Sequence, residues 1–449
     1  MRDIVLLSIL PFLVYAIFQR SFIGLGLWIW TAMFFPNGWV YGIAGVIRYN
    51  LLFAGLTIGV YFMSKQKLRL QLGTVGWMVI LFLIWTFFTT LFGLAIPDVA
   101  WEEWTKLVKI VALFVFILLI IEKKLHIDFF LWCLIFSVGF FAAVEGLKYI
   151  VSGGGHHIEG MMGHVLQDNN QLALALAALL PICFYLLGEY GKKSWILKFG
   201  LLSLIVLDIT SIIGTNSRGG LVALATVGGY LFIKSKRKFL FVLLVLGIGS
   251  AMVGLIPEQW FNRMDTLNNA SADGSFMDRV VAWKLSTILA IQNPIFGGGF
   301  KALEYPPNWF ALAQDYYRYP ILHFGTVPNP RESHAAHSIY FQVLGDHGFI
   351  GLFIFLMIYV TSFFKAGSIA KKIRLANGPE WMINLATMLR LSIFTYAVGG
   401  AALSLAYFDM TFAICGLVLI LETKFLPEMI KDGEKLKKPL DLRITDSNM

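Results

Sequence analysis

The hydrophobic positions of this chain gather into long apolar runs separated by short polar segments. Roughly 20 consecutive apolar residues carry a helix across a bilayer, and runs near that length recur along almost the whole sequence. The pattern predicts an all-α polytopic integral membrane protein with about 12 transmembrane helices, roughly 11–13. The apolar runs lie near residues 3–18, 21–36, 47–63, 73–96, 107–122, 127–150, 170–188, 198–214, 219–233, 239–256, 338–364, 385–405 and 410–424.

Basic residues occur at every second loop between these runs. The positive-inside rule places such loops on the cytoplasmic side of a membrane, so the remaining loops face outward. The basic clusters are Lys65, Lys67 and Arg69; Lys123 and Lys124; Lys192 and Lys193; Lys234, Lys236, Arg237 and Lys238; and Lys371, Lys372 and Arg374.

The N-terminal stretch MRDIVLLSILPFLVYAIFQR has the composition of a signal peptide, but no small-residue cleavage site precedes the next apolar run. We therefore interpret it as a retained first span. The first two runs are short, with Gln19 and Arg20 between them. They form either two short spans, or one span and a partly embedded segment.

Residues 257–336 form one long insert between two apolar runs, on the outward side. A loop of this length is usually functional. Its stretch DGSFMDRVVAWKLSTILAIQNP has apolar residues at helical spacing, which predicts an amphipathic helix near the membrane surface, and NPIFGGGF predicts a glycine-rich turn after it. The predicted divisions are N-terminal transmembrane helices (1–256), the long outer loop (257–336), C-terminal transmembrane helices (337–424) and a cytoplasmic tail (425–449).

Composition agrees with this class. Hydrophobic residues make up 58% of the 449 residues and charged residues 14%, and the mean hydropathy is +0.73, outside the range of a soluble domain. The net charge of +9 would suit nucleic acid, but the basic residues gather in short cytoplasmic loops, so we expect no nucleic-acid partner. Cys133, Cys183 and Cys415 lie in apolar runs and predict no disulfide.

Seven of the eight histidines lie outside the cytoplasmic loops, so any histidine chemistry belongs to the outer face. His334 and His337 stand at i and i+3 and could share one face of a helix. A zinc site needs a third and a fourth ligand, and His347 lies well round that helix, so we expect no metal. The alternative to a reaction centre is a solvated histidine at a helix end. Gly348 and Gly351 would let this helix pack closely on a neighbour.

Two arginines and two lysines are candidates for binding an anion at the outer face. Arg218, in GTNSRGG, offers a planar fork of donors that matches phosphate oxygens, and the alternative is an interfacial anchor. Arg279 lies on the predicted amphipathic helix, where a solvated charged face is the alternative. Lys106 and Lys109 enter an apolar run from the outward side, which favours an anionic partner, although two preceding glutamates could neutralise them.

Nucleotide-dependent chemistry has no support in the sequence. It contains no P-loop, no GxGxxG after a strand, no HExxH and no GxSxG. It also lacks a DxD pair that would hold a divalent ion against a nucleotide sugar. We therefore expect no cofactor.

Four stretches together resemble the O-antigen ligase / O-antigen polymerase superfamily of bacterial inner-membrane glycosyltransferases. QDNNQLALALAALLP is similar to its Asn-x-x-Ala segment, with Asn170 and Ala173 in place, and TNSRGGLVAL resembles its Ser-Arg-Gly stretch. DRVVAWKLSTILAIQNPIFGGGF resembles its Arg…Trp…Asn/His-Pro-x-x-Gly-x-Gly helix. Its histidine signature aligns with His337 and Ser338, where many members have Asn instead of serine. The likeness covers residues 165–365, and the N-terminal region resembles a subgroup of O-glycosylation ligases from exopolysaccharide loci.

This resemblance implies a GT-C-like fold and an enzyme of the bacterial inner membrane whose active site faces the periplasm. The reaction would transfer O-antigen from undecaprenyl diphosphate to the lipid A–core, with inversion and without a metal. It implies Arg218 and Arg279 at the diphosphate, and His337 as either acceptor base or phosphate ligand. Further candidates for donor or acceptor contacts are Lys106, Lys109, Asn170, His334 and Arg331.

The sequence is also compatible with other functions. Within the superfamily, an O-antigen polymerase would extend the glycan by a repeat unit, and a protein O-glycosyl ligase would use Ser or Thr hydroxyls. A polysaccharide transporter or flippase is the alternative from another class. It predicts charged residues concentrated inside the spans, where Glu145, Asp208 and Arg390 are found.

Overall fold

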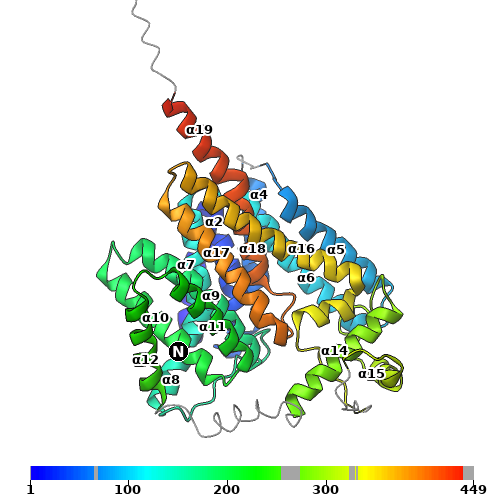
Figure 1. Ribbon diagram of the computed structural model, residues 1–449. Coiled ribbons are helices and arrows are strands. Elements are labelled where there is room, and N and C mark those ends of the chain that lie inside the picture. The colour runs from blue at the N-terminus through cyan, green and yellow to red at the C-terminus, as the bar shows by residue number, and fades with distance from the viewer. Residues whose placement is uncertain (1, 65–68, 254–273, 323–328, 330–331, 438–449) are drawn as a thin grey trace, which may run out of the picture.

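The structure is a computed structural model that describes residues 2–64, 69–253, 274–322, 329 and 332–437 (Figure 1). Every regular element in these ranges is a helix, and eight helices are long and apolar enough to cross a membrane. The predicted all-α polytopic class is confirmed. Two further apolar helices within the described ranges have fewer than 18 residues, so the count of about 12 spans stays a prediction.

The N-terminal part of the chain forms helices joined mostly by short loops. They are α1 (Arg2–Gln19), α2 (Ser21–Phe34), α3 (Gly42–Val46), α4 (Tyr49–Met63), α5 (Gly73–Leu91), α6 (Pro97–Ile120), α7 (Lys124–Leu134), α8 (Phe140–Val151), α9 (Asn169–Tyr190), α10 (Trp195–Gly214), α11 (Arg218–Lys234) and α12 (Lys238–Val253). A π-helical turn, η2 (Ile135–Gly139), joins α7 to α8. The first two apolar runs thus form two separate helices, α1 and α2.

The C-terminal part has fewer and longer elements. They are α14 (Gly274–Gln292), α15 (Pro306–Gln314), η4 (Tyr316–Arg318), α16 (Ile339–Leu375), α17 (Glu380–Gly399), η5 (Gly400–Ala402), α18 (Asp409–Ile420), η6 (Leu421–Phe425) and α19 (Leu426–Lys437). The last span continues without a break from α18 through η6 into α19, which projects from the bundle in Figure 1.

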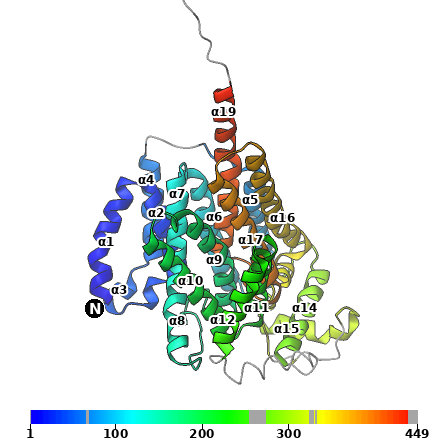
Figure 2. The same cartoon turned by 60° about the vertical axis from the view of Figure 1, so that its left-hand side comes forward.

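α9 and α18 form the centre of the helix bundle. A helix that is apolar around its whole circumference is buried by other helices. In α9, and in the continuous helical span Asp409–Lys431 that begins with α18, 78% of the most apolar stretch is buried. The corresponding figure for α1 is 6%, and α1 lies at the edge of the bundle in Figure 2. α9 packs against α10, α11 and α17, so it is held by several neighbouring helices.

The two ends of the bundle differ in charge. At one end, the ammonium group of Lys124 lies 3.3 Å from a carboxylate oxygen of Glu189 at the end of α9 and over the Trp381 ring at the start of α17. This end carries the basic loops and is named the basic end. The opposite end, where α9, α11 and α16 begin, is named the site end. The side of the membrane that each end faces stays a prediction from the positive-inside rule.

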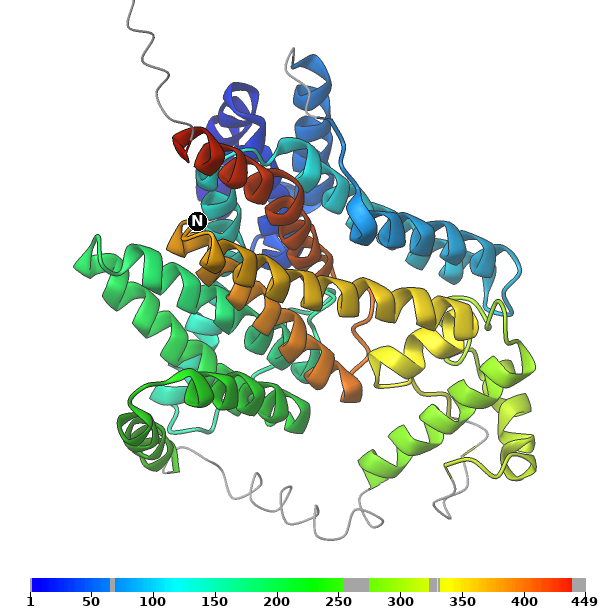
Figure 3. The same cartoon turned by 45° about the horizontal axis from the view of Figure 1, so that its top comes forward.

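α14 and α15 form a small outer subdomain at the site end, visible in Figure 3. The predicted amphipathic helix is present as α14, and the glycine-rich turn follows it. Residues 257–273 of the predicted loop lie outside the described residues. The subdomain has its own hydrophobic core, made of Val281, Ala282, Leu285, Ile288, Leu289, Ala302, Leu303, Trp309, Leu312, Tyr316 and Ala336.

A sharp bend in α16 ties this subdomain to the bundle. Gly348 has φ 67° and ψ −170°, which interrupts the helix. The amides of Gly298 and Gly299 donate to carbonyl oxygens of α16, each over 2.8 Å, and a Cβ atom on Gly297 would lie 2.5 Å from the Gly348 nitrogen. The expected close approach at Gly348 is therefore present, but its partner is the glycine-rich turn and not a neighbouring helix.

Candidate functional site

The starts of α9 and α11 are joined by hydrogen bonds between their caps. The Asp168 carboxylate accepts the backbone N–H groups of Asn170 and Gln171. Ser217 caps α11, because its Oγ accepts the Gly220 N–H over 3.1 Å, and the same hydroxyl donates to Asn170 Oδ1 over 2.8 Å. Such caps satisfy N–H groups that a helix leaves unpaired at its start. They also fix the two helix starts relative to each other.

Arg218 is the first residue of α11 and follows this cap directly. Asn216, just before the cap, has φ 53°, a left-handed conformation that asparagine tolerates better than most residues. The positive end of the helix dipole and the first N–H groups of a helix favour an anion at this position. Arg218 is thus placed where a negatively charged ligand is already favoured.

Residues 402–404, which are the last residue of η5 and the two residues after it, connect these helix starts to the outer subdomain. Gln171 Nε2 donates to the Ser404 carbonyl oxygen over 2.7 Å. From α14, Arg279 Nη1 donates to the Ala402 carbonyl oxygen over 3.3 Å. Gly219, next to Arg218, packs against Leu403. The two arginines therefore border the same short segment, which is named the 402–404 segment, although they belong to different helices.

His337 reaches the same place from a third direction. It stands immediately before Ser338, the N-cap of α16, and has φ 46°. A side chain in this left-handed region carries a cost in backbone energy, and such strain gathers at functional sites. Ile339, the first residue of α16, packs closely on Gly400, two residues before the 402–404 segment.

The charges around His337 come from several elements. Burial lowers the pKa of His337 from its usual value, the positive charge of Arg279 lowers it further, and the Asp168 carboxylate acts in the opposite direction. The imidazole is therefore neutral at neutral pH, and a neutral imidazole can accept a proton. A neutral base next to fixed cationic side chains can remove a proton while the cations stabilise a developing negative charge.

Comparison with protein families found two matches. Residues 203–356 match the family described as O-antigen ligase. This match supports the O-antigen ligase superfamily for the segment 203–356. Residues 1–191 match a family of unknown function (DUF5935). A search of curated proteins found no match.

The O-antigen ligase match includes the three predicted catalytic residues, Arg218, Arg279 and His337, and also Arg331 and His334. The structure brings all three to the 402–404 segment. Asn170 lies outside the matched range but joins them through its hydrogen bond with Ser217. The spatial grouping of these four residues is therefore present, while their catalytic and binding roles stay predictions.

His334 and His337 do not share a helical face, because α16 begins only at Ile339. Both precede the helix, and the left-handed backbone at His337 turns the chain between them and α16. The His334 ring stands edge-on to Trp309 of α15, with ring centroids 5.5 Å apart, and its charge contributes to lowering the pKa of His337. His334 thus lies at the border between the outer subdomain and the site.

The lysines of α6 have other surroundings. Lys106 forms ion pairs with Glu102 and Glu103, at 2.9 and 3.1 Å, as the neutralisation alternative predicts. Lys109 lines a cavity between α2, α4 and α6. No described contact joins either lysine to the 402–404 segment. Arg331 lies outside the described residues.

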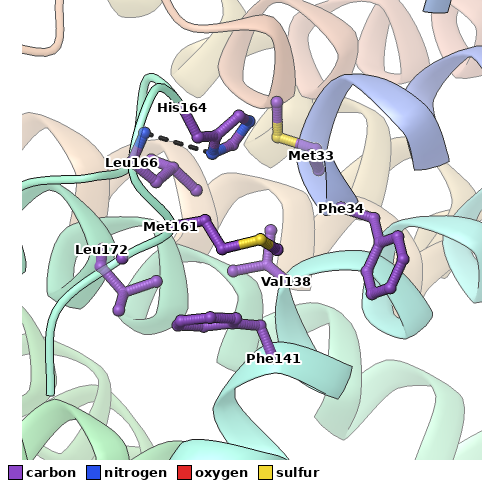
Figure 4. Close-up of a pocket in the computed structure, with 9 residues that line it drawn as sticks. Met33, Phe34, Val138, Phe141, Met161, His164, Leu166 and Leu172 are labelled. Carbon is purple, nitrogen blue, oxygen red and sulfur yellow. Dashed lines mark hydrogen bonds between the residues drawn. The ribbon is translucent and has the colours of Figure 1, made fainter. Parts of the chain in front are cut away.

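Two other histidines, His164 and His347, have structural contacts. His164, in the small pocket of Figure 4, accepts the Leu166 N–H at Nδ1 over 3.3 Å and donates from Nε2 to the Ala32 carbonyl oxygen over 2.8 Å. Burial lowers its pKa, so the neutral ring fastens the loop before α9 to the end of α2. His347 is fully buried, and its Nδ1 lies 2.6 Å from Thr89 Oγ1.

Three parts of the site were missed in the sequence: Asp168, Gln171 and the 402–404 segment. An acidic residue just before an apolar run is a helix N-cap signal, so Asp168 could have been found. Gln171 lies on the first turn of α9, where nothing in the sequence marks its long-range partner. The 402–404 segment has no charged side chain, and its backbone carbonyls make the contacts.

Proposed function

We propose that this protein transfers a glycan from undecaprenyl diphosphate to the lipid A–core, on the periplasmic side of the bacterial inner membrane. The match of residues 203–356 to the O-antigen ligase family supports ligase- or polymerase-type chemistry in polysaccharide biosynthesis. The observation that carries the proposal is the meeting of Arg218, Arg279 and His337 at the 402–404 segment. The energy for the transfer comes from the activated donor itself.

The arginines suit the leaving group of this reaction. When the bond between the anomeric carbon and the diphosphate breaks, its electron pair stays with the diphosphate, whose negative charge grows. A guanidinium group binds two phosphate oxygens at once, and Arg218 does so at the start of α11, where the helix dipole adds to its charge. Cationic groups that are in place before the reaction need no reorganisation as charge develops.

His337 suits the acceptor. Its ring nitrogen takes the proton of the acceptor hydroxyl as the hydroxyl oxygen forms the new bond to the anomeric carbon. Attack from the face opposite the diphosphate inverts the configuration at that carbon. Burial and Arg279 both lower the pKa of His337, so the ring is free to accept this proton at neutral pH.

An apolar cavity next to His337 suits the lipid chain of the donor. It has a volume of about 240 Å³ between α16 and α17, and begins at Ile339 and Tyr340. Its deeper walls include Val360 and Phe394. A polyprenyl chain there would stay in an apolar environment while its diphosphate reached the site end.

The direct test measures transfer by purified protein with a lipid-linked glycan donor and a lipid A–core acceptor. His337→Ala should lower the transfer rate by roughly 100-fold or more, the usual contribution of a general base, while donor binding persists. His126→Gln is the matched control, because His126 stacks on Phe22 near the basic end. Transfer by His337→Ala at near the wild-type rate would contradict the assignment.

The alternative functions predict different products in a deletion strain. Loss of all capped lipopolysaccharide, with lipid-linked polymer still present, supports the ligase, whereas a single capped repeat indicates a polymerase. Unchanged lipopolysaccharide with loss of a glycoprotein indicates a protein O-glycosyl ligase. A flippase would show no glycan transfer by the purified wild-type protein.

A further inference from the structure

A cavity with two cationic side chains lies at the site end, between α2, α4 and α6. It has a volume of about 410 Å³, and its lining includes Arg48 and Lys109 together with Asn37, Asn50 and Trp28. None of these residues belongs to the 402–404 segment or touches it through a described contact.

The two cations of this cavity have no ion-pair partner among the described residues. The nearby glutamates are engaged elsewhere: Glu102 pairs with Lys106, and Glu103 with Lys106 and with Lys301 at 3.0 Å. On the α1 side, the Asp3 carboxylate accepts the backbone N–H of Tyr41 over 2.7 Å. The buried Asp409 carboxyl also interacts electrostatically with Lys109, but no described ion pair joins them. With two cations and this one acid nearby, the cavity keeps a positive charge and is complementary to an anion.

Arg48 and Lys109 each stand directly before a long stretch without charged residues. Arg48 is the residue before α4, whose sequence YNLLFAGLTIGVYFM contains no charge. Lys109 is followed in α6 by the uninterrupted apolar stretch IVALFVFILLI. A cationic group at such a boundary lies at the depth of lipid headgroups. Trp28 and Ala54 continue the lining on the apolar side.

The walls of the cavity are held in place by their own hydrogen bonds. Asn37 Nδ2 donates to the carbonyl oxygens of Gly45 and Ile47, over 2.8 and 2.7 Å, and Asn50 Nδ2 donates to that of Trp28 over 3.1 Å. His164 Nε2 donates to the Ala32 carbonyl oxygen and so fastens the end of α2, which also lines the cavity. The cavity is thus formed before any ligand arrives, which lowers the entropic cost of binding.

We propose that this cavity binds the phosphate group of an anionic phospholipid from the surrounding leaflet, with Arg48 and Lys109 at the phosphate and the acyl chains along α2 and α4. A membrane lipid, and not the glycan acceptor, is the occupant, because no described contact joins the cavity to His337. The proposal is independent of the transfer reaction, and its test needs no donor or acceptor.

The test uses full-length protein in mixed micelles and native mass spectrometry of retained lipid, with phosphatidylglycerol and phosphatidylcholine as probes. Wild-type protein should retain phosphatidylglycerol in preference to phosphatidylcholine. Arg48→Gln with Lys109→Gln should weaken phosphatidylglycerol retention by roughly fivefold for each cation removed. Arg48→Lys with Lys109→Arg should retain most of the preference and also shows that the altered cavity still folds.

A charge-matched control removes two cations elsewhere, as Lys148→Gln with Arg318→Gln. Lys148 pairs with Glu145, and Arg318 lies near Asp315, so both already have acidic neighbours. This control should keep the wild-type lipid preference. Equal loss in the control, equal retention of the two lipids by wild type, or displacement of phosphatidylglycerol by lipid A–core would each overturn the proposal.

Discussion

The two cationic regions at the site end differ in what surrounds their charges. Near His337, the arginines stand beside helix caps and backbone carbonyls, as the bond from Arg279 to Ala402 shows. Near Lys109, the lining combines amide groups with apolar and aromatic walls. The first environment suits a diphosphate held in a fixed reaction geometry, and the second suits a phosphate whose chains stay in the bilayer. Similar charges can therefore serve different ligands because their surroundings differ.

The largest expected effect tests whether geometry or charge matters at the reaction site. Arg218→Lys and Arg279→Lys should each lower kcat/KM for glycan transfer by roughly 10²–10³-fold, the usual loss for one preorganised donor. Lysine keeps the positive charge but loses the planar fork that binds two phosphate oxygens.

Arg237→Lys is the control for this pair, because Arg237 lies in a basic loop between α11 and α12. It should transfer glycan at the wild-type rate. Wild-type activity of Arg218→Lys and Arg279→Lys would show that positive charge alone is sufficient at the site. The site would then not differ in this respect from the cavity between α2, α4 and α6.

An intermediate effect, on the free energy of unfolding, is expected when a glycine beside each of the two cationic regions is replaced by alanine. Gly297 has φ 65°, and a Cβ atom there would lie 2.5 Å from the Gly348 nitrogen, whereas Gly42, before the lipid cavity, has φ 57° and open space around it. Gly42→Ala should lower the free energy of unfolding by about 1–2 kcal/mol from backbone strain alone. Gly297→Ala should lower it further because the clash forces backbone to move.

Thermal unfolding of both variants in the same detergent measures this difference. Gly297→Ala should also lower glycan transfer, since the glycine-rich turn connects the outer subdomain to α16. Equal unfolding temperatures for the two variants would show that the joint at Gly348 is not sterically constrained.

The smallest effect concerns the pH dependence of transfer. A base is active when deprotonated, so activity should fall as the pH drops through the pKa of His337, which burial and Arg279 place below its usual value. Asp168→Asn keeps a side chain that can cap the helix but removes the negative charge that raises the pKa of His337. The loss of activity at acid pH, the acid limb of the pH profile, should therefore move to lower pH. Arg279→Gln should move the limb of the residual activity to higher pH.

Profiles of kcat/KM against pH for both variants provide the measurement. Movement of the two limbs in the same direction, or no movement, would contradict the placement of these charges around His337. Arg48→Gln, in the cavity between α2, α4 and α6, should leave the limb in place, because no described contact joins Arg48 to His337.

Much of the fold followed from local pattern. The helical spacing in DGSFMDRVVAWKLST predicted α14, and the uniformly apolar stretch after Asn170 became the buried helix α9. Their position at the mouth of apolar runs made Arg218 and His337 candidates, and the resemblance to the family's motifs selected them, with His337 preferred to His334. These features depend on a few neighbouring residues, so the sequence displays them directly.

Other features depend on contacts between distant segments. At the bend at Gly348, α16 binds the glycine-rich turn, which lies some fifty residues earlier in the chain. No local signal in the sequence shows that this turn is the partner of the bend. Lys106 and Lys109 looked alike in the sequence, yet α6 turns one toward glutamates and the other into a cavity. Tertiary packing decided both outcomes, and single-sequence periodicity contains no information on it.

The joint between the glycine-rich turn and α16 determines where chimeras of such proteins can be spliced. The apparent boundary between loop and span lies near residue 336, but Gly298 and Gly299 bind the helix beyond that point. A splice near residue 336 would take the glycine-rich turn from one parent protein and the part of α16 that binds this turn from the other. A splice after Phe349, whose N–H donates to the Pro294 carbonyl oxygen, would exchange both halves together. The outer subdomain and the first turns of α16 therefore form one structural unit and should be exchanged together.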